Sequence, residues 1–400
     1  MKKLNKDITF IYMDNAEKAI YQPIAEEASR RGYQVKLTDD KFAKCEIGVY
    51  CQHINFPQFS KFSVIMLHDI IQQYGNWPDL WLREPWNKYD IGILPSKQWV
   101  ENWGRCSQYY YANPRIGMYQ VGWPKADRYA HLDKDRFRLD FNAKHRLDNN
   151  KKTILYAPSW ENDGKQDDFV QAMLKLGVNI LVKQATVDPN YSPSFHDMYE
   201  AILEMKERHK DIPEVTILDP GTNIFEAILA CDVLVSDESS TMCEAVMMGI
   251  PAVSVSDWLI PDVSPKRFPQ CDYDFVYMTK KANLKACVSD ILNRYDEVRE
   301  QVDYFRLRTF GEVGGCAEKI MDIVDDCVDG GPIRYEKLTP ATREKVPFDK
   351  YRFHVIEGIK RELYYNYNKR YKLVHIVYEP IRRLKKEIEG KLNTSQTPAQ

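Results

Sequence analysis

A cluster of hydroxyl side chains follows a short apolar run in the second half of the chain. Ser239, Ser240 and Thr241 stand where a strand is expected to give way to a helix, and Glu244 lies one turn into that helix. The first N–H groups of a helix lack partners within it, so a phosphate binds there readily, and hydroxyls add further donors. Glu244 could accept hydrogen bonds from the two hydroxyls of a ribose. The pattern therefore indicates a site for a nucleotide.

A second interpretation of the same residues involves no ligand. Thr241 and Glu244 stand at the spacing of the T-x-x-E capping box, in which both side chains bond to backbone N–H groups of the first turn. Asp237 and Glu238 precede the hydroxyls and would repel a phosphate if their carboxylates faced it. Both interpretations stay open on this segment alone.

Short apolar runs alternate with helical patterns along most of the chain. They occur at 8–13, after the glycine of "RRGYQVKL" (30–37), at 46–51, 62–67 and 89–96, and again at 153–160, 179–185, 214–220, 232–237 and 251–257. Such runs, separated by helices, are typical of parallel sheets with helices on both faces. We therefore predict two doubly wound α/β domains at residues 1–148 and 149–330, followed by a helical tail at 331–400. Ligands of such folds bind at the carboxyl ends of the strands, between the domains.

The composition excludes several classes of protein. A hydrophobic content of 44% with 28% charged residues is typical of a soluble globular protein, and a formal net charge of -2 excludes a globally basic nucleic-acid-binding protein. The nine cysteines form no CxxC pair, which argues against a zinc site or a disulfide framework. No stretch reaches the roughly 18 to 20 apolar residues of a membrane span, and the N-terminal apolar run is too short for a signal peptide. We expect a protein that is cytoplasmic or bound to the inner face of the cell membrane.

Four segments together resemble the CDP-glycerol glycerophosphotransferases of the teichoic-acid type. They are "DVLVSDESSTMCEAVMMGIPAVSV" at 232–255, "VGWPKADRY" at 121–129, "ILYAPSW" at 154–160, and "IMLHD" at 65–69, where the family carries a Trp-His-Gly segment. The segments follow the family's order. The resemblance implies two facing Rossmann-type domains of the GT-B architecture. It also implies transfer of a polyol phosphate from a CDP-activated donor at the cytoplasmic membrane surface.

The resemblance assigns a role to a residue of the first domain. His68 would end a strand there and, as a neutral imidazole, remove a proton from an acceptor hydroxyl. A hydrogen-bonded structural histidine is the alternative. Asp69 is not expected to orient His68, because neighbours on a strand point to opposite sides. Lys125 and Asp127 are expected to fix the connection between the domains.

The second domain would hold the donor. Besides the hydroxyls at 239–241 and Glu244, Ser159 and Lys183 would contribute to binding, since phosphoryl transfer depends on positioning and charge stabilisation. Lys183 could equally be an ordinary surface lysine at a strand end. No cofactor is implied. The segment 271–274 resembles a metal-binding D-x-D pair, but such pairs are common in loops, so no metal ion is expected.

Two positions depart from the family's pattern. The family has a Lys-x-His-Pro segment where this chain reads Lys183-Gln184-Ala185, and an arginine often stands where this chain has Glu161. Both positions are expected near the donor phosphates. A nucleotide-sugar donor on the same fold therefore stays an alternative.

Three functions are compatible with the sequence. The first is a transferase that moves glycerol or ribitol phosphate from a CDP-activated donor to a hydroxyl of a lipid-linked or glycan acceptor, in teichoic acid or capsule synthesis. The second is a GT-B glycosyltransferase that uses a nucleotide sugar. The third is a catalytically silent nucleotide-binding scaffold of a cell-envelope complex.

The tail at 351–392 is basic and rich in tyrosine, with basic residues outnumbering acids by about two to one. Basic side chains are drawn to anionic headgroups by about 1 kcal/mol each near the surface, and tyrosine suits the boundary between water and hydrocarbon. Pro380 should divide the segment into two amphipathic helices that lie on the bilayer. The alternative is a charged helix packed across the N-terminal domain.

Truncation after about residue 345 is therefore expected to leave the fold and activity on a soluble acceptor intact, and to abolish sedimentation with anionic liposomes, because the basic residues are removed. Sedimentation of both forms with liposomes at low salt measures this. Binding that persists in the truncated protein, or that is absent in the full chain, would contradict the prediction.

Overall fold

The computed structural model describes residues 4–52, 55–70, 86–271 and 273–341, together with 355–356, 380–381 and 384. The tail at 351–392 lies almost entirely outside these residues, so its role stays a prediction. Within the described ranges, every helix is too short or too polar to cross a membrane.

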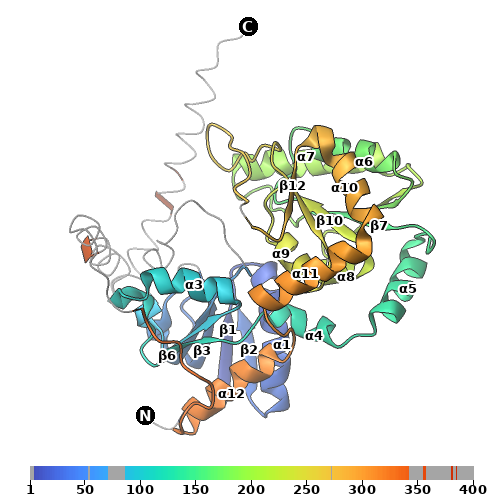
Figure 1. Cartoon of the computed structure of the whole chain (residues 1–400). Coiled ribbons are helices and arrows are strands. Elements are labelled where there is room, and N and C mark those ends of the chain that lie inside the picture. Colours follow the sequence, from blue (N-terminus) through green and yellow to red (C-terminus); the bar gives the residue numbers. More distant parts are fainter. Residues whose placement is uncertain are drawn as a thin grey trace.

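Two six-stranded parallel sheets lie one above the other in Figure 1. The first has the order β2 (Gln34–Thr38), β1 (Asp7–Ile11), β3 (Cys45–Cys51), β4 (Ser60–Met66), β5 (Ile91–Leu94) and β6 (Gly117–Gln120). The second has the order β12 (Tyr277–Thr279), β11 (Ala252–Val255), β10 (Val233–Ser236), β7 (Thr153–Tyr156), β8 (Asn179–Val182) and β9 (Val215–Ile217). The prediction of two doubly wound α/β sheets is confirmed.

Helices connect the strands and flank the sheets. Their bounds are α1 (Asn15–Arg30), α3 (Lys97–Cys106), α4 (Asp127–Ala130), α5 (Lys134–His145), α6 (Lys165–Leu174), α7 (Pro193–His209), α8 (Ile224–Ala230), α9 (Thr241–Met247), α10 (Leu284–Asn293), α11 (Tyr295–Thr309) and α12 (Cys316–Val328). Asp14, Ser96, Ser192 and Asn223 each accept a backbone N–H at the start of a helix, which fixes where α1, α3, α7 and α8 begin.

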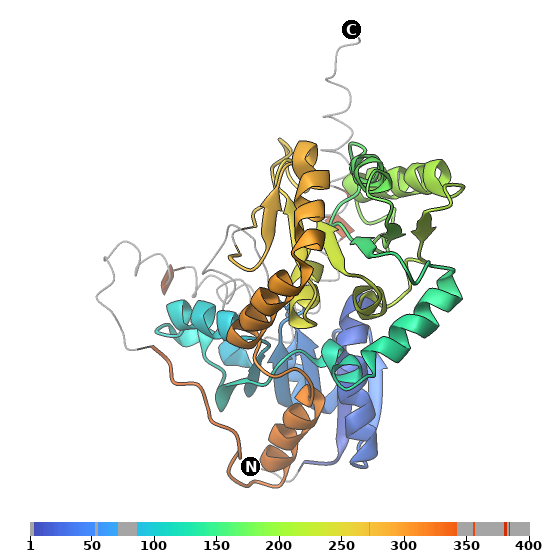
Figure 2. The ribbon, with the colours of Figure 1, turned by 45° about the vertical axis from the view of Figure 1, so that its right-hand side comes forward.

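The last of these helices returns to the first sheet. In Figures 1 and 2, α12 lies beside α1. Arg31 donates to Asp322 at 2.7 Å and to Asp325 at 2.8 Å, and the Tyr33 hydroxyl also donates to Asp325. Residues 316–328, which the predicted division assigns to the second domain, therefore pack against the first.

The two halves share one continuous apolar core. It extends from Phe10 in β1 to Val235 in β10, and Trp123 and Tyr129 belong to it. The ring of Tyr129 stacks on Phe225 at 5.4 Å between centroids, which joins the segment after β6 to α8. Burial of apolar surface therefore holds the halves together as well as each sheet.

Gly92 in β5 lies where a side chain has no room. A Cβ atom there would meet Sδ of Met118 at 2.6 Å and Cγ of Pro114 at 2.7 Å. Gly92→Ala is therefore expected to lower the free energy of unfolding by about 1 to 3 kcal/mol. Gly104→Ala in α3 is the matched control, because a Cβ there meets nothing within 4 Å and alanine favours a helix by about 0.5 to 1 kcal/mol. Thermal melting should show a lower Tm for the first variant alone, and equal Tm values would contradict the tight packing.

Candidate active site

The residues predicted from the sequence lie at the carboxyl ends of strands in both sheets. His68 follows β4, Ser159 follows β7, Lys183 follows β8, and the hydroxyls at 239–241 follow β10. The two edges meet, because Oγ of Ser240 donates to Oδ1 of Asp69 at 3.5 Å. The structure thus brings the candidate base and the hydroxyl cluster to one place.

His68 is paired with its neighbour in the chain. Its Nε2 lies 3.0 Å from Oδ2 of Asp69. The prediction that Asp69 would not orient His68 is wrong, because β4 ends at Met66 and the chain bends there, so the alternation of a strand no longer applies. Burial disfavours the charged imidazolium, but the carboxylates of Asp69, Glu17 and Asp14 outweigh it and raise the pKa of His68.

The acids that precede the hydroxyl cluster are neutralised by partners of their own. Asp237 is fully buried and accepts from Nζ of Lys165 at 2.9 Å and from the backbone N–H of Ser159 at 2.7 Å. Burial alone would raise the pKa of Asp237, but the charge of Lys165 and these N–H groups hold it below its usual value. Glu238 accepts both terminal guanidinium nitrogens of Arg267, at 2.5 and 2.7 Å. The repulsion of a phosphate that the sequence suggested is therefore largely compensated.

The hydroxyls are partly bonded to each other. Oγ1 of Thr241 donates to Oγ of Ser239 at 3.0 Å, and α9 begins at Thr241 without a side-chain cap from Ser240. The capping box considered from the sequence is thus absent. Oγ of Ser159 is buried, and no donor or acceptor among the described residues reaches it. A bound anion requires hydroxyl hydrogens to donate, and those of Ser239 and Ser159 are donated to no other group among the described residues, whereas those of Ser240 and Thr241 are.

Glu244 joins the two halves of the molecule. Its Oε1 accepts from Nε1 of Trp123 at 3.0 Å and from Nζ of Lys125 at 2.8 Å, and its side chain is 3% exposed. Lys125 thus connects the domains as expected. Asp127 accepts from the backbone N–H groups of Cys316 and Ala317, and so fixes the place where the chain returns to the first half at the start of α12. Contact of Glu244 with a ribose stays a prediction.

Lys183 is buried at the end of β8, so the alternative of an ordinary surface lysine is wrong. Its Nζ donates to the carbonyl oxygens of Gln184 at 2.9 Å and Pro220 at 2.8 Å. Burial lowers the pKa of Lys183 to about 8, with Asp219 opposing and Lys125 adding to the shift. Lys183 is therefore a cation near neutral pH that has little contact with water.

Residues 76–258 match the family model described as CDP-Glycerol:Poly(glycerophosphate) glycerophosphotransferase. This part of the chain belongs to that glycerophosphotransferase family. The match includes the Gly-Trp-Pro segment, Ser159, Lys183 and the junction at 237–244. His68 lies before it. No curated protein sequence matches the chain significantly.

Solved structures share the fold of this chain. The wall teichoic acid polymerase TagF, soaked with CDPG, has a TM-score of 0.55 and 16% identity, over 81% of this chain and 89% of that one. A TagF variant has a TM-score of 0.58 and 13% identity, over 82% and 90%. A putative UDP-N-acetylglucosamine 2-epimerase from Listeria monocytogenes has a TM-score of 0.50 and 12% identity, over 85% and 100%. At these identities the likeness shows the GT-B-like fold alone.

The two departures from the glycerophosphotransferase pattern contact each other. Nε2 of Gln184 donates to Oε2 of Glu161 at 2.6 Å and to Oε1 of Gln166 at 2.8 Å, and the hydroxyl of Tyr156 donates to the same oxygen of Glu161. All four side chains are buried, and burial raises the pKa of Glu161 to about 7. Glu161 and Gln184 therefore satisfy each other's hydrogen-bonding groups inside the second half, and neither side chain is exposed at the carboxyl edge of the sheet.

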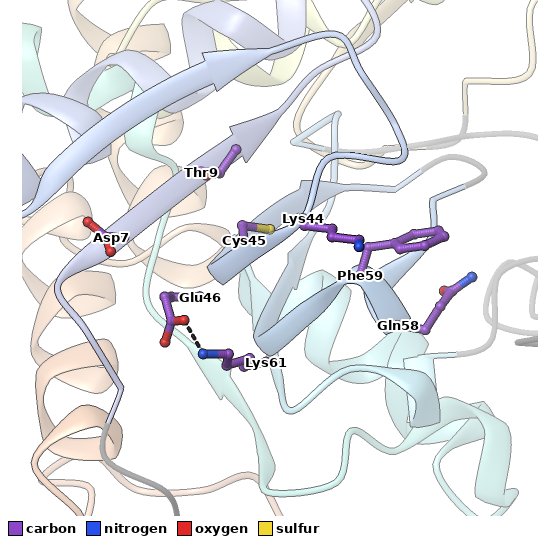
Figure 3. A pocket seen from close by; sticks show the side chains of 8 residues that line it. All are labelled: Asp7, Thr9, Lys44, Cys45, Glu46, Gln58, Phe59 and Lys61. Atoms are coloured by element: carbon purple, nitrogen blue, oxygen red, sulfur yellow. Dashed lines mark hydrogen bonds and ion pairs between the residues drawn. The ribbon is translucent and has the colours of Figure 1, made fainter. Parts of the chain in front are cut away.

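A pocket of about 430 Å³ lies elsewhere, at the amino ends of β1, β3 and β4 (Figure 3). It is lined by Asp7, Thr9, Lys44, Cys45, Glu46, Gln58, Phe59 and Lys61. Glu46 and Lys61 form an ion pair in it. None of the predicted site residues lines this pocket, so it is separate from the carboxyl-edge site. Across the described ranges, no group of three or more His, Cys, Asp or Glu side chains could hold a metal ion, and Asp272 lies outside those ranges.

The contact between Lys125 and Glu244 can be measured by a double-mutant cycle. Glu244→Gln is expected to lower the free energy of unfolding by about 1.5 to 3 kcal/mol, because Lys125 loses a charged partner in a mostly buried place. Combined with Lys125→Met, the losses should not add, with a coupling energy of about 0.5 to 3 kcal/mol. Chemical denaturation measures each variant.

The exposed pair Arg136 and Asp140 in α5 serves as the control for this cycle. Its coupling energy should be only about 0.3 to 0.5 kcal/mol, because water screens both charges. A coupling energy between Lys125 and Glu244 as small as that of the control would contradict their assigned role.

Proposed function

We propose that this glycerophosphotransferase moves a polyol phosphate, glycerol or ribitol phosphate, from a CDP-activated donor to a hydroxyl of a lipid-linked or glycan acceptor in cell-envelope polymer synthesis. The observation that carries the proposal is the family match over 76–258, which contains the hydroxyl cluster at the end of β10. The contact between Ser240 and Asp69 supports it, because it places a candidate base beside that cluster. The acceptor would be reached at the inner face of the membrane, with the tail as the anchor.

The second half would hold the diphosphate of the donor. Ser239 and Ser159 offer hydroxyl groups, Ser240 would do so on release of Asp69, and Lys183 supplies positive charge from a buried position. The helix N-terminus contributes little, since α9 has only seven residues. The hydroxyls and the lysine therefore carry this part of the proposal, because an anion is held most strongly by donors and charges shielded from water.

The reaction is a displacement at phosphorus. The acceptor oxygen attacks the phosphorus that bears the polyol, His68 takes the proton of that hydroxyl, and the bond from phosphorus to the CMP oxygen breaks. CMP leaves with the electron pair, and a phosphodiester to the acceptor is formed. His68 must be neutral to act, so the rate should rise as the pH increases through the pKa of His68.

The departures at Glu161 and Gln184 were the reason to consider a nucleotide-sugar donor. They are buried and bonded to each other, which weakens that reason. The discriminating experiment incubates the protein with CDP-glycerol, CDP-ribitol and a panel of UDP-sugars, and assays released CMP and UDP. The proposal expects CMP from a CDP-polyol. Release of UDP alone would support the glycosyltransferase, and release of neither would support the silent scaffold.

His68→Ala is expected to reduce turnover at least about 100-fold, since general base catalysis contributes about that much or more. Binding of CDP-glycerol, measured by calorimetry, should change little, because the donor contacts lie in the second half. His196→Ala, at an exposed position of α7, is the matched control and should retain activity. Turnover of His68→Ala at the wild-type level would remove the base role from His68.

A further inference from the structure

We propose that Asp69 is a positioning residue for His68, which it orients and whose protonated form it stabilises during the reaction. The inference rests on the proposed function only for the statement that His68 is the base. The family segment at this place reads Trp-His-Gly, with glycine where this chain has Asp69. The pairing is therefore a property of this chain and is not transferred from the family pattern.

The two carboxylate oxygens of Asp69 have different partners. Oδ2 lies 3.0 Å from Nε2 of His68, which is hydrogen-bonding distance, and Oδ1 accepts from Oγ of Ser240 at 3.5 Å. The second bond is long, as polar contacts in active sites without substrate often are. Ser240 belongs to the other half of the molecule. Asp69 is thus held from both sides of the site.

The contact determines which nitrogen of His68 can accept a proton. When Asp69 accepts the hydrogen of Nε2, the neutral ring carries its lone pair on Nδ1. In the reaction the acceptor hydroxyl loses its proton to Nδ1 as the oxygen attacks phosphorus. The imidazolium that results lies against the negative charge of Asp69, which stabilises it. Asp69 itself keeps no proton at any step.

Other titratable groups near His68 and Asp69 also influence the pKa of His68. Glu17 and Asp14, at the N-terminus of α1, also raise the pKa of His68. Glu17 is buried, and burial raises its own pKa to about 7, while His68 and Lys41 oppose that shift. In α9, the pKa of Cys243 is raised by burial above all, with Cys271, Glu244 and Asp69 adding to the effect. Oδ2 of Asp69 lies within hydrogen-bonding distance of the ring, at 3.0 Å from Nε2.

Asp69→Asn distinguishes a positioning role of Asp69 from a purely structural one, because it should lower both the pKa of His68 and the plateau of kcat. The pKa of His68 should fall, since a negative charge beside the imidazolium is lost. The rise of activity with pH should therefore shift to lower pH. The plateau of kcat should fall about tenfold or more, since a charge-assisted bond is lost from the transition state. Asp140→Asn, the same change of charge at an exposed position, is the control.

The decisive measurement is an NMR titration of the protein labelled in its histidine rings, without substrate. The His68→Ala variant identifies the signal. We expect the pKa of His68 to be lower in Asp69→Asn, unchanged in Asp140→Asn and still raised in Asp69→Glu. A pKa in Asp69→Asn equal to that of the wild type would overturn the inference, and so would an unaltered kcat plateau. If the wild type releases no CMP from any CDP donor, the proposed function fails, while the titration still decides whether Asp69 holds His68.

Discussion

The arrangement of the site depends on a buried carboxylate at the end of β10. Asp237 accepts the ammonium group of Lys165 and the backbone N–H groups that follow β7, so one side chain ties two neighbouring loops together. Removing one partner of such a buried pair typically costs about 3 to 5 kcal/mol, because the other charge is left without compensation. The pair has a second consequence. Asp237 brings a negative charge to the junction where a phosphate is proposed to bind, and Lys165 neutralises that charge. Ser239 and Ser240 can therefore stand directly after an acid.

The contacts between the halves extend this arrangement to the first sheet. Glu244 holds the Gly-Trp-Pro segment through Trp123 and Lys125, and Ser240 reaches Asp69. After the second sheet, the chain returns to the first half, where α12 packs beside α1. Neither sheet carries the proposed site alone, since the candidate base comes from the first and the proposed donor contacts come from the second. The proposed reaction, in which donor and acceptor bind to different halves, requires such a division.

Most strands could be predicted because parallel strands buried on both faces read as continuous apolar runs. The strands β6 (GMYQ) and β12 (YMT) were not, since glycine or polar residues interrupt each of them and leave no continuous apolar run. The contact between Asp69 and His68 could not be predicted, because the sequence does not show that β4 ends at Met66. The partners of Glu244 and the pairing of Glu161 with Gln184 could not be found, because contacts between distant parts of a chain leave no local signal. The positions of the hydroxyl cluster and of Lys183 at the ends of strands, in contrast, could be predicted, because each follows an apolar run.

The central claim is that the donor binds at the carboxyl edges of the two sheets, and a crystal structure of the protein with CDP-glycerol bound tests it most directly. The account predicts diphosphate oxygens within about 3.5 Å of the hydroxyls of Ser239 or Ser240 and of Nζ of Lys183. It also predicts that the phosphorus that bears the glycerol faces His68. A donor bound in the pocket at the amino ends of β1, β3 and β4, or bound with its phosphates away from both His68 and β10, would contradict it.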